Sequence, residues 1–552
     1  MSKLGIALDL GTSGFRGQAI DLEEKKVLGT AITARHPLPG ANVIDHLNFA
    51  IDAGSGVAHH LMMTAINQLL RLLPVGRRSD IKRLAVCGNP IQLSLFEDIE
   101  IRDLAYAGEN KRRLLGIVSP DRSSKEYRGG DRFPGLEIPA DCLVLIPPAV
   151  KHEIGADALA MLVLSGILDR KEVCLATDYG TNAEIALKAG DKIITGSCAA
   201  GPALEGQHIN RGMLAAPGAV ADLRPEGKAH RCLVLDESMA LGEGELVDIA
   251  SGAVLGKGQL KAKGITGTGV AATIARGFAA KLINLPRIET ADTYLHLAND
   301  IRFGEEDLAE AGKAIGAIRA GYLTLAAEAG IELEEIRVAY MAGASGTYVD
   351  ARKAMQIGMV PPRVKEIYQV GNTSLTMSRA LVQEPGRLKE LEKIAQELRA
   401  SHCMFATSKI FEKAYLLELS YWTEGLPWEQ YHKLSKMYHL PELPPVELTA
   451  CHVTKVDRDI TEVGSAGVAV LEKVGREVCL AVFGCIACGR CVEKCPETAL
   501  SLTDDDRLAL RMDRCNGTAC CRCEHECPEK VFHLADFWSH VLGSKNNGQP
   551  RS

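Results

Sequence analysis

The sequence predicts an α/β protein in which two lobes of related fold precede a small α+β domain. Two similar hairpins of apolar strands, with turns that begin at Asp9 and Asp178, predict the two lobes. A third apolar strand runs into a glycine-containing turn at 343–346 and predicts a site shared by both lobes. The small domain is predicted by the cysteines, because more than half of the 17 lie within residues 479–527.

Length and composition set the first limits. At 552 residues the chain is too long for one hydrophobic core, so roughly three or four domains are expected. It is 46% hydrophobic and 24% charged, which is ordinary for a globular protein. A net charge of −7 and an aromatic content of 5% argue against a nucleic-acid partner, which needs a basic face or stacking platforms.

The sequence also predicts where the protein works. The N-terminal letters MSKLGIALDLG begin directly with a strand pattern and lack the regions of a secretory signal. The longest apolar stretches, CLVLIPPAV and ALAMLVLSGIL, are shorter than the roughly 20 residues that span a bilayer. We therefore expect a cytoplasmic protein with no membrane partner. In that compartment, many cysteines more often mean metal or redox chemistry than disulfides.

Both hairpins have the same pattern: an Asp closes an apolar strand, a Gly-Thr turn follows, and a second apolar strand begins. The first lies in LGIALDLGTSGFRGQAIDL and the second in EVCLATDYGTNAEIALKAGDKIITG. The repetition predicts an internal duplication. The candidate residues are Asp9, Gly11, Thr12, Ser13 and Gly14 in the first turn, and Asp178, Gly180, Thr181 and Asn182 in the second.

These residue types suit a nucleotide phosphate. Glycine lets the backbone approach an anion closely, and hydroxyl and N–H groups are donors. Asp9 and Asp178, the candidate catalytic residues, would hold a hydrated Mg²⁺ or orient the attacking water. In IRVAYMAGASGTYVD, Gly343 and Gly346 would let a base or ribose lie against the backbone. For one hairpin alone, an ordinary tight turn is the alternative.

Other nucleotide motifs are missing from the sequence. It contains no G-x-x-x-x-G-K-S/T P-loop and no clean dinucleotide fingerprint. KGITGTGVAAT, residues 263–273, predicts one further glycine-rich junction between a strand and a helix. The two hairpins and the third strand together resemble the actin/Hsp70/sugar-kinase superfamily, whose two ribonuclease-H-like lobes hold ATP in a cleft. The resemblance implies ATP with Mg²⁺, with 9–14 and 178–182 as phosphate loops and 343–346 as the adenosine loop.

Two cysteine runs, each closed by Cys-Pro, occupy the small domain. Each resembles the bacterial-ferredoxin run, in which three close thiolates hold one cubane and the fourth holds the other cluster. The resemblance implies two [4Fe-4S] clusters with crossed ligation, one on Cys485, Cys488, Cys491 and Cys527 and the other on Cys515, Cys520, Cys523 and Cys495. A pair of zinc ribbons is the alternative. The second run has a wider first spacing, and we expect Cys521 and Cys479 not to be ligands.

The chain is expected to divide into five parts. These are a first lobe at 1–170, a second lobe at 171–440, a linker at 441–478, a ferredoxin-like domain at 479–537 and a tail at 538–552. The linker begins with the proline-rich PELPPVELTA. Helical spacing predicts helices over 56–73 and 388–406, which would contain His59, His60 and His402 as structural histidines.

From Leu4 to about Ala535 the chain resembles the methylamine methyltransferase corrinoid protein reductive activases, members of the reductive activators of corrinoid-dependent enzymes. The matching strings include GIALDLGTSGFR, RLAVCGNPIQLSLF, TDYGTNAE, IITGSCAAGPALEGQ, YMAGASGTYVDA and GNTSL, together with both cysteine runs. They follow one another in the same order over almost the whole chain.

The resemblance implies an oxidoreductase that uses ATP to reduce Co(II) to Co(I) on corrinoid methyl-carrier proteins of methylamine methyltransferase systems. An upstream low-potential donor would supply electrons through the two clusters. The chain lacks an Asp-x-His-x-x-Gly corrinoid motif, so the cobalt is expected on the partner. One alternative is an ATP-driven electron injector for another enzyme, such as a radical dehydratase. Another is a kinase-like scaffold whose ferredoxin part serves only docking or redox sensing.

Overall fold

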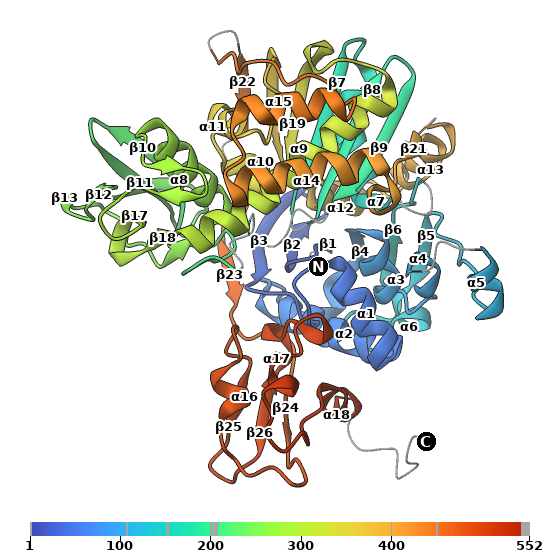
Figure 1. Ribbon diagram of the computed structural model, residues 1–552. Coiled ribbons are helices and arrows are strands. Elements are labelled where there is room, and N and C mark those ends of the chain that lie inside the picture. The colour runs from blue at the N-terminus through green and yellow to red at the C-terminus, as the bar shows by residue number, and fades with distance from the viewer. Residues whose placement is uncertain are drawn as a thin grey trace.

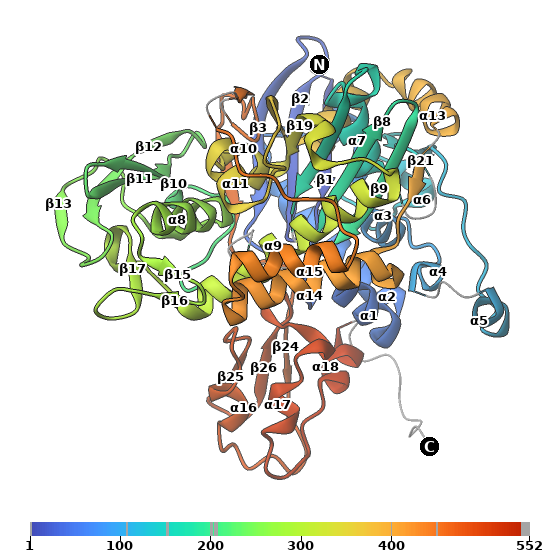
Figure 2. The same ribbon diagram turned by 45° about the horizontal axis from the view of Figure 1, so that its top comes forward.

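The computed structural model describes residues 3–105, 109–150, 154–180, 182–198, 203, 208–398, 400–448, 451–456 and 458–541. In Figure 1 the first lobe lies at the centre and the second lobe above it. A small lateral domain projects to the left, and the C-terminal domain lies below the first lobe. Figure 2 shows the same separate parts from a second direction.

The first lobe is built on a seven-stranded sheet. Its order is β23 (Val468–Leu471), β3 (Lys26–Thr33), β2 (Phe15–Asp21), β1 (Leu4–Leu10), β4 (Ile81–Gly88), β6 (Leu143–Ile146) and β5 (Lys125–Arg128). Strands β1, β2 and β3 pair antiparallel, whereas β4 and β6 continue parallel to β1. All seven residues of β1 are buried, which explains why this strand reads as an almost unbroken apolar run.

The second lobe repeats this arrangement. Its order is β21 (Ala400–His402), β9 (Lys192–Cys198), β8 (Ala183–Ala189), β7 (Val173–Tyr179), β19 (Ile336–Ala342), β20 (Glu366–Gly371) and β22 (His452–Lys455). Again three antiparallel strands are followed by two that run parallel to the first. The predicted duplication of a hairpin unit is therefore confirmed, because Asp9 and Asp178 end the equivalent strands β1 and β7.

Two helices link the lobes. Helix α7 (Ala156–Leu164) follows β6 of the first sheet and lies between the lobes: one side belongs to the core of the first lobe, and Ala158, Met161 and Leu162 belong to a cluster with β7 and β19 of the second sheet. Helix α12 (Thr373–Gln383) follows β20 of the second sheet but packs against β1 and β4 of the first, and also against α7. The two helices therefore connect the lobes where the cleft lies.

The remaining helices of the two lobes lie outside the sheets, and the short α5 (Glu109–Leu114) projects away from the first lobe (Figures 1 and 2). On the first lobe they are α1 (Val43–Ala53), α2 (Ser55–Leu72), α3 (Pro90–Phe96), α4 (Arg102–Ala105), α5 (Glu109–Leu114), α6 (Gly129–Arg132) and α13 (Arg387–Glu397). On the second they are α9 (Glu305–Ala329), α10 (Gly343–Tyr348), α11 (Ala351–Ile357), α14 (Lys409–Glu424) and α15 (Trp428–Met437). Helix α9 has 25 residues; three acids in its first turn stabilise its positive N-terminal end, and Gly330, at φ +72°, ends it in the left-handed conformation.

A lateral domain interrupts the second lobe and was not expected from the sequence. It contains the sheet β13 (Val254–Gly256), β12 (Leu241–Asp248), β11 (Ala229–Leu235), β10 (Ala219–Glu226) and β14 (Gly264–Ile265), with α8 (Gly267–Ala279). Two short ribbons follow: β15 (Ile283–Asn284) with β16 (Arg287–Ile288), and β17 (Tyr294–His296) with β18 (Arg302–Gly304). The predicted strand-to-helix junction at 263–273 is confirmed as β14 and α8, but it lies in this domain rather than at the cleft.

The C-terminal domain has a three-stranded sheet, β24 (Glu477–Leu480), β26 (Leu508–Arg511) and β25 (Leu500–Leu502). Its helices are α16 (Arg490–Glu493), α17 (Arg522–His525) and α18 (Leu534–His540). The domain shares a continuous apolar core with the first lobe, and Trp538 of α18 meets Phe49 of α1 edge-on at 5.0 Å between ring centroids. Strand β23, within the expected linker, pairs parallel with β3 and joins this domain directly to the first sheet.

Two further outcomes concern the expected boundaries. Trp538 and Val541 are buried although they fall in the expected tail, and β22 and β23 lie in the expected linker. The division into five parts stays a prediction. The expected helix over 388–406 is wrong at its end: α13 stops at Glu397, and His402 lies in β21, since Ala400–His402 pair with the edge strand β9. The helix over 56–73 is confirmed as α2.

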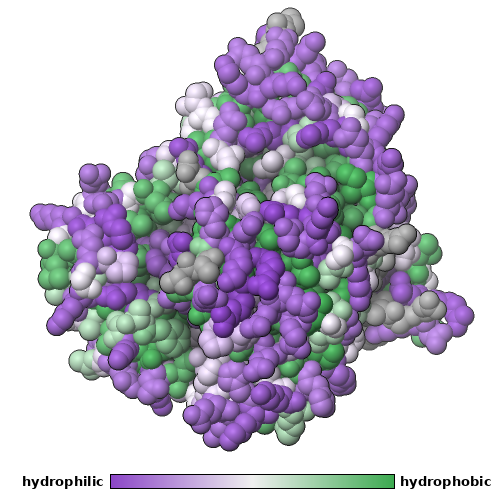
Figure 3. Space-filling view, turned by 90° about the horizontal axis from the view of Figure 1, so that it is seen from above, coloured by the Kyte–Doolittle hydropathy of each residue, from purple (hydrophilic) through white to green (hydrophobic). Residues whose placement is uncertain are grey.

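The surface also bears on the partners. Among the helices of the described ranges, none is both long and apolar enough to cross a membrane. Seen from above in Figure 3, hydrophilic side chains cover most of the visible face, and apolar residues appear in separate patches. This face therefore offers no single broad apolar surface.

Candidate functional site: a nucleotide cleft and two cysteine pockets

The predicted loops of both lobes meet in one cleft. The cleft holds about 80 Å³ of free space and opens to solvent. Seven of the predicted residues line it: Asp9, Gly11 and Thr12 from the first hairpin, Asp178, Gly180 and Asn182 from the second, and Gly343 from the start of α10. Segments far apart in the sequence are thus brought together as the repeated pattern predicts.

The other predicted residues lie beside the cleft or outside the described ranges. Ser13, Gly14 and Gly346 are buried but do not line the space. Gly14 lies so close to β3 that a Cβ would come within 2.8 Å of Thr33 Oγ1, so its small size serves packing. Thr181 lies outside the described residues.

The two candidate catalytic carboxylates are held differently. Asp9 is buried; the Asn372 Nδ2 amide donates a hydrogen bond of 2.7 Å to its Oδ2, and Arg16 Nη1 lies 3.7 Å away. Asp178 lies directly against Gly343, where a Cβ would come within 2.4 Å of Asp178 Oδ1. Gly343 has φ +79°, so both its conformation and its lack of a side chain are needed there.

Several cleft residues were missed in the sequence. Asn89 follows the end of β4, caps α3 and donates through Nδ2 to Thr12 Oγ1 at 3.1 Å. Asn372 follows β20 in the same way and caps α12. Both stand in a Gly-Asn pair between a strand and a helix, and this repeated pair is a signal that could have located them. Asp157 and Glu184 also line the cleft but stand alone in apolar segments without such a signal.

The cleft concentrates buried negative charge. Burial and the nearby Asp9 raise the pKa of Asp157 to about 6. Burial, together with Asp157 and Asp178, raises the pKa of Glu184 to about 8, although the Ser197 hydroxyl donates to it at 2.7 Å. Burial also raises the pKa of Asp9, against the opposing effect of Arg16 and Asn372. Among the described residues no three of these carboxylates are arranged to hold a metal ion by themselves, so a divalent cation would take one or two of them together with phosphate and water oxygens, and would favour their ionised forms.

The cysteines of the C-terminal domain form two groups. One pocket is lined by Cys485, Cys488, Cys491 and Cys527, and the other by Cys495, Cys515, Cys520 and Cys523. Each group takes three cysteines from one run and the fourth from the other, which is the grouping that the tandem runs predict. The two pockets enclose about 390 and 350 Å³ of space, counted to their mouths.

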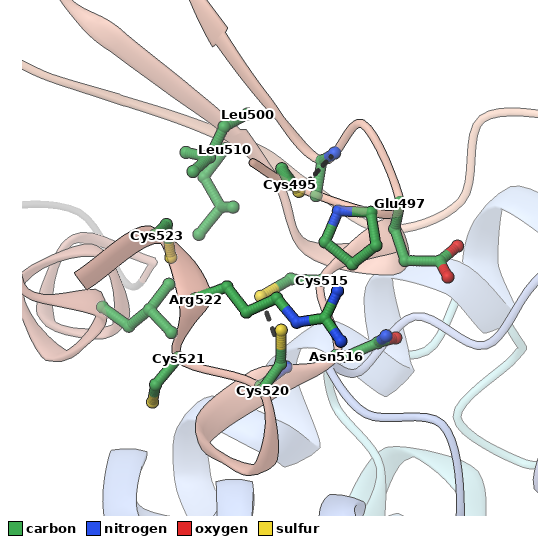
Figure 4. A pocket seen from close by; sticks show the side chains of 14 residues that line it. Cys495, Glu497, Leu500, Leu510, Cys515, Asn516, Cys520, Cys521, Arg522 and Cys523 are labelled. Atoms are coloured by element: carbon green, nitrogen blue, oxygen red, sulfur yellow. Dashed lines mark hydrogen bonds between the residues drawn. The ribbon is translucent and has the colours of Figure 1, made fainter. Parts of the chain in front are cut away.

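Figure 4 shows the second pocket. The sulfurs of Cys495, Cys515, Cys520 and Cys523 face a common space, whereas that of Cys521 points away from it. The Cys521 thiol instead donates to the Thr518 carbonyl at 3.1 Å. Backbone N–H groups are directed at the sulfurs: Ala499 N lies 3.2 Å from Cys495 Sγ and Gly517 N lies 3.3 Å from Cys515 Sγ. Such donors stabilise thiolates, the form in which cysteine binds iron.

Cys521 has a structural explanation. It precedes α17 with φ +44°, just as Gly489 precedes α16 with φ +74°. In both runs a cysteine, one left-handed residue, an arginine and another cysteine follow in the same order. Cys521 therefore occupies the position of a glycine. The wider first spacing of the second run is taken up by the short 3₁₀ turn Gly517–Ala519.

The fold and the cleft define a protein of the actin, Hsp70 and sugar-kinase class that carries an additional domain with two cysteine pockets. A family model described as the C-terminal domain of RACo, the ASKHA domain, matches residues 172–432, and one described as the RACo middle region matches residues 4–170. A Methanosarcina barkeri protein named Co(II) methylated amine-specific corrinoid protein reductase is 48% identical over 519 residues, 93% of this chain and 95% of its own length. The chain belongs to the RACo family of reductive activators.

Two more distant proteins agree with this assignment. A Eubacterium limosum protein named corrinoid activation enzyme RamQ is 25% identical over 452 residues, which cover 75% of this chain and 69% of that protein. A solved structure of a reductive activator for corrinoid, iron–sulfur protein superposes with a TM-score of 0.61 at 22% identity. The match covers 76% of this chain and 66% of that one, and it shows that the two share the fold.

Proposed function

We propose that this protein uses ATP to reduce the Co(II) corrinoid of methyl-carrier proteins in methylamine systems to Co(I). The relatives reported above are a corrinoid protein reductase and a corrinoid activation enzyme, which favours this function over activation of a radical dehydratase. Cobalt gains one electron in this reaction, and an upstream low-potential donor loses it.

One observation carries the proposal. The same apolar core joins the first lobe, which supplies half of the cleft, to a domain with two groups of four cysteines. A nucleotide site alone would suit a kinase, and paired cysteine pockets alone would suit an electron carrier. Their attachment to one core suits a protein that couples the nucleotide cycle to electron transfer.

The cysteine pockets fit [4Fe-4S] clusters. Each pocket takes three thiols from one tandem run and a fourth from the other, as in the bacterial-ferredoxin arrangement, whereas zinc ribbons use two CxxC pairs. The eight grouped cysteines would therefore hold two clusters, which when bound would supply one-electron transfer. The N–H groups of Ala487, Ala499 and Gly517 would stabilise the charge on three of the sulfurs.

The cleft fits ATP with Mg²⁺. The turns after Asp9 and Asp178 would offer backbone N–H groups to phosphates, and the left-handed Gly343 would lie against the base or ribose. The buried acids would hold the cation or the attacking water. The chain's own contribution is to bring both lobes onto one ligand. If two orientations of the lobes bind the nucleotide with different affinities, the nucleotide cycle can supply free energy to an electron transfer that is otherwise unfavourable. For one electron, a difference of about 59 mV in reduction potential corresponds to a factor of ten in the equilibrium constant.

An anaerobic assay tests this function. Reconstituted protein, Ti(III) citrate and a Co(II) methylamine carrier are mixed, and the Co(I) absorbance is followed with and without ATP. We expect Co(I) only with ATP. Cys491→Ser should abolish Co(I) formation and leave ATP binding intact, whereas Cys479→Ser, an exposed cysteine of β24 outside both pockets, should behave as the unaltered protein. Normal Co(I) formation by Cys491→Ser would disprove the role given to the pockets.

A further inference from the structure

A groove of about 1370 Å³ lies where the two lobes and the C-terminal domain meet. The first lobe supplies Arg35 and Asp45, helix α9 of the second lobe supplies Glu306 and Glu310, and the residue after β23 supplies Glu472. Small-molecule sites measure roughly 300–1,000 Å³, so the groove is larger than a free nucleotide or metabolite needs. Its size suits a broad group that a partner protein presents.

The groove shares a wall with the second cysteine pocket. Five residues line both spaces: Pro496, Glu497, Asn516, Cys520 and Arg522. A single layer of side chains therefore separates the groove from the second group of thiols, and Figure 4 shows Arg522 and Asn516 beside Cys520 in that layer. Among the described residues, none that lines the first pocket also lines the groove.

The shared wall also contacts both lobes. The Glu497 carboxylate lies 3.5 Å from Arg35 Nη1 of the first lobe and 3.9 Å from His208 Nε2 of the second. The Asn516 amide lies 3.4 Å from the same His208 nitrogen. A movement of one lobe against the other would therefore change the shape of the groove beside Cys520.

The charge of the groove limits what it can bind. Its charged side chains are mostly acidic: Asp45, Glu306, Asp307, Glu310, Glu472 and Glu497 against Arg35 and Arg522. Such a surface disfavours nucleotides and other anions. A Co(II) corrin ring carries positive charge, and its rim carries primary amides that donate hydrogen bonds to carboxylates. The charge and the size of the groove therefore match a corrin macrocycle.

We propose that this groove is the docking site for the corrinoid-bearing face of the carrier protein, with the macrocycle next to the Cys520 side of the second pocket. The proposal rests on the proposed function. Under this proposal the second pocket, and not the first, lies beside the cobalt that accepts the electron.

Charge reversal on the two sides of the groove tests the proposal. Glu472→Lys alters the first-lobe side and Glu306→Lys the second-lobe side, and both side chains are exposed. The probe is a fluorescently labelled Co(II) methylamine carrier, and its affinity for the protein is measured by anisotropy. Each reversal should weaken binding by about tenfold at low salt, because a carboxylate that attracts positive charge on the partner is replaced by an ammonium group that repels it.

Glu126→Lys is the matched control, since Glu126 is exposed on β5 at the opposite edge of the first sheet from β23. Glu126→Lys should leave the affinity for the carrier unchanged. Urea unfolding of all three variants, with midpoints close to that of the unaltered protein, shows that they are folded. Unchanged binding by both groove variants would overturn the docking site. Equal affinity for a corrinoid-free carrier would overturn the position of the macrocycle. Failure of the proposed function gives a different result, because the unaltered protein would then form no Co(I).

Discussion

Replacement of Gly343 by alanine perturbs the cleft at one defined point. The residue begins α10 with φ +79°, and a Cβ there would lie 2.4 Å from Asp178 Oδ1 and 3.2 Å from the Tyr179 carbonyl oxygen. Ordinary contact begins at 3.4 Å, so the Asp178 carboxylate must move by about 1 Å. The substitution therefore acts on backbone strain and on the position of a catalytic candidate at once.

The two effects have different sizes. An alanine in the left-handed conformation costs about 1–2 kcal/mol of stability. A displacement of about 1 Å in a positioned catalytic group costs on the order of a hundredfold in rate. We therefore expect Gly343→Ala to lower the free energy of unfolding modestly and ATP turnover by about a hundredfold. The stability effect alone would leave almost all molecules folded at 25 °C.

The assay separates these effects by a matched variant. Gly330→Ala introduces the same strain at φ +72°, but a Cβ there has nothing within 4 Å. Urea unfolding should show similar losses for both variants, whereas ATP turnover should fall only for Gly343→Ala. Equal turnover in the two variants would refute the placement of Asp178 against Gly343 as a requirement of the site.

The remaining predictions concern the thiols and the buried acids. Cys521→Gly should raise the free energy of unfolding by about 1 kcal/mol without loss of iron, because glycine adopts the φ of +44° at this position without strain. Cys520→Ser should instead lose about half of the bound iron. Urea titration measures the stability of both variants, and iron analysis measures their iron content. Binding of Mg·ATP near pH 7 should release protons, because Glu184, with a pKa of about 8, becomes ionised beside the cation; calorimetry in two buffers detects this, and zero release contradicts it. Without nucleotide, the free energy of unfolding should fall by roughly 1 kcal/mol from pH 7 to pH 9, because Glu184 in the folded protein loses a proton that it has already lost in the unfolded chain. Glu184→Gln should remove this part of the dependence of the free energy of unfolding on pH.

The parts of the site that lie next to each other in the sequence could be predicted. Asp9 and Asp178 each close a buried strand, and strand alternation and the glycine turn are local signals. The crossed grouping of the cysteines was also expected, because the repeated run is itself local and only its partner lies elsewhere. Duplication then indicated that the two hairpins share one site.

The residues contributed by single positions could not be predicted in the same way. Asp157 and Glu184 lie in apolar segments; Asp157 reaches the cleft because α7 packs between the two lobes, and Glu184 reaches it from β8. Asn372 reaches Asp9 because α12 crosses to the other lobe, a contact over more than three hundred residues that no periodicity encodes. The lateral domain was missed because its strands carry no counterpart of the Asp-x-Gly-Thr turn that marks the two hairpins.

The crossed cysteine groups have a consequence for biogenesis. On the ribosome, Cys485, Cys488 and Cys491 are made well before Cys527, the fourth thiol of their pocket. The second pocket likewise stays incomplete until Cys523 is synthesised, although Cys495 is made early. Neither pocket can be completed before the other is almost complete, whereas both lobes have by then been synthesised. If the pockets hold the proposed clusters, iron would enter late, into a chain whose larger part is already able to fold, and a shortage of iron would leave the C-terminal domain, not the nucleotide cleft, unfinished.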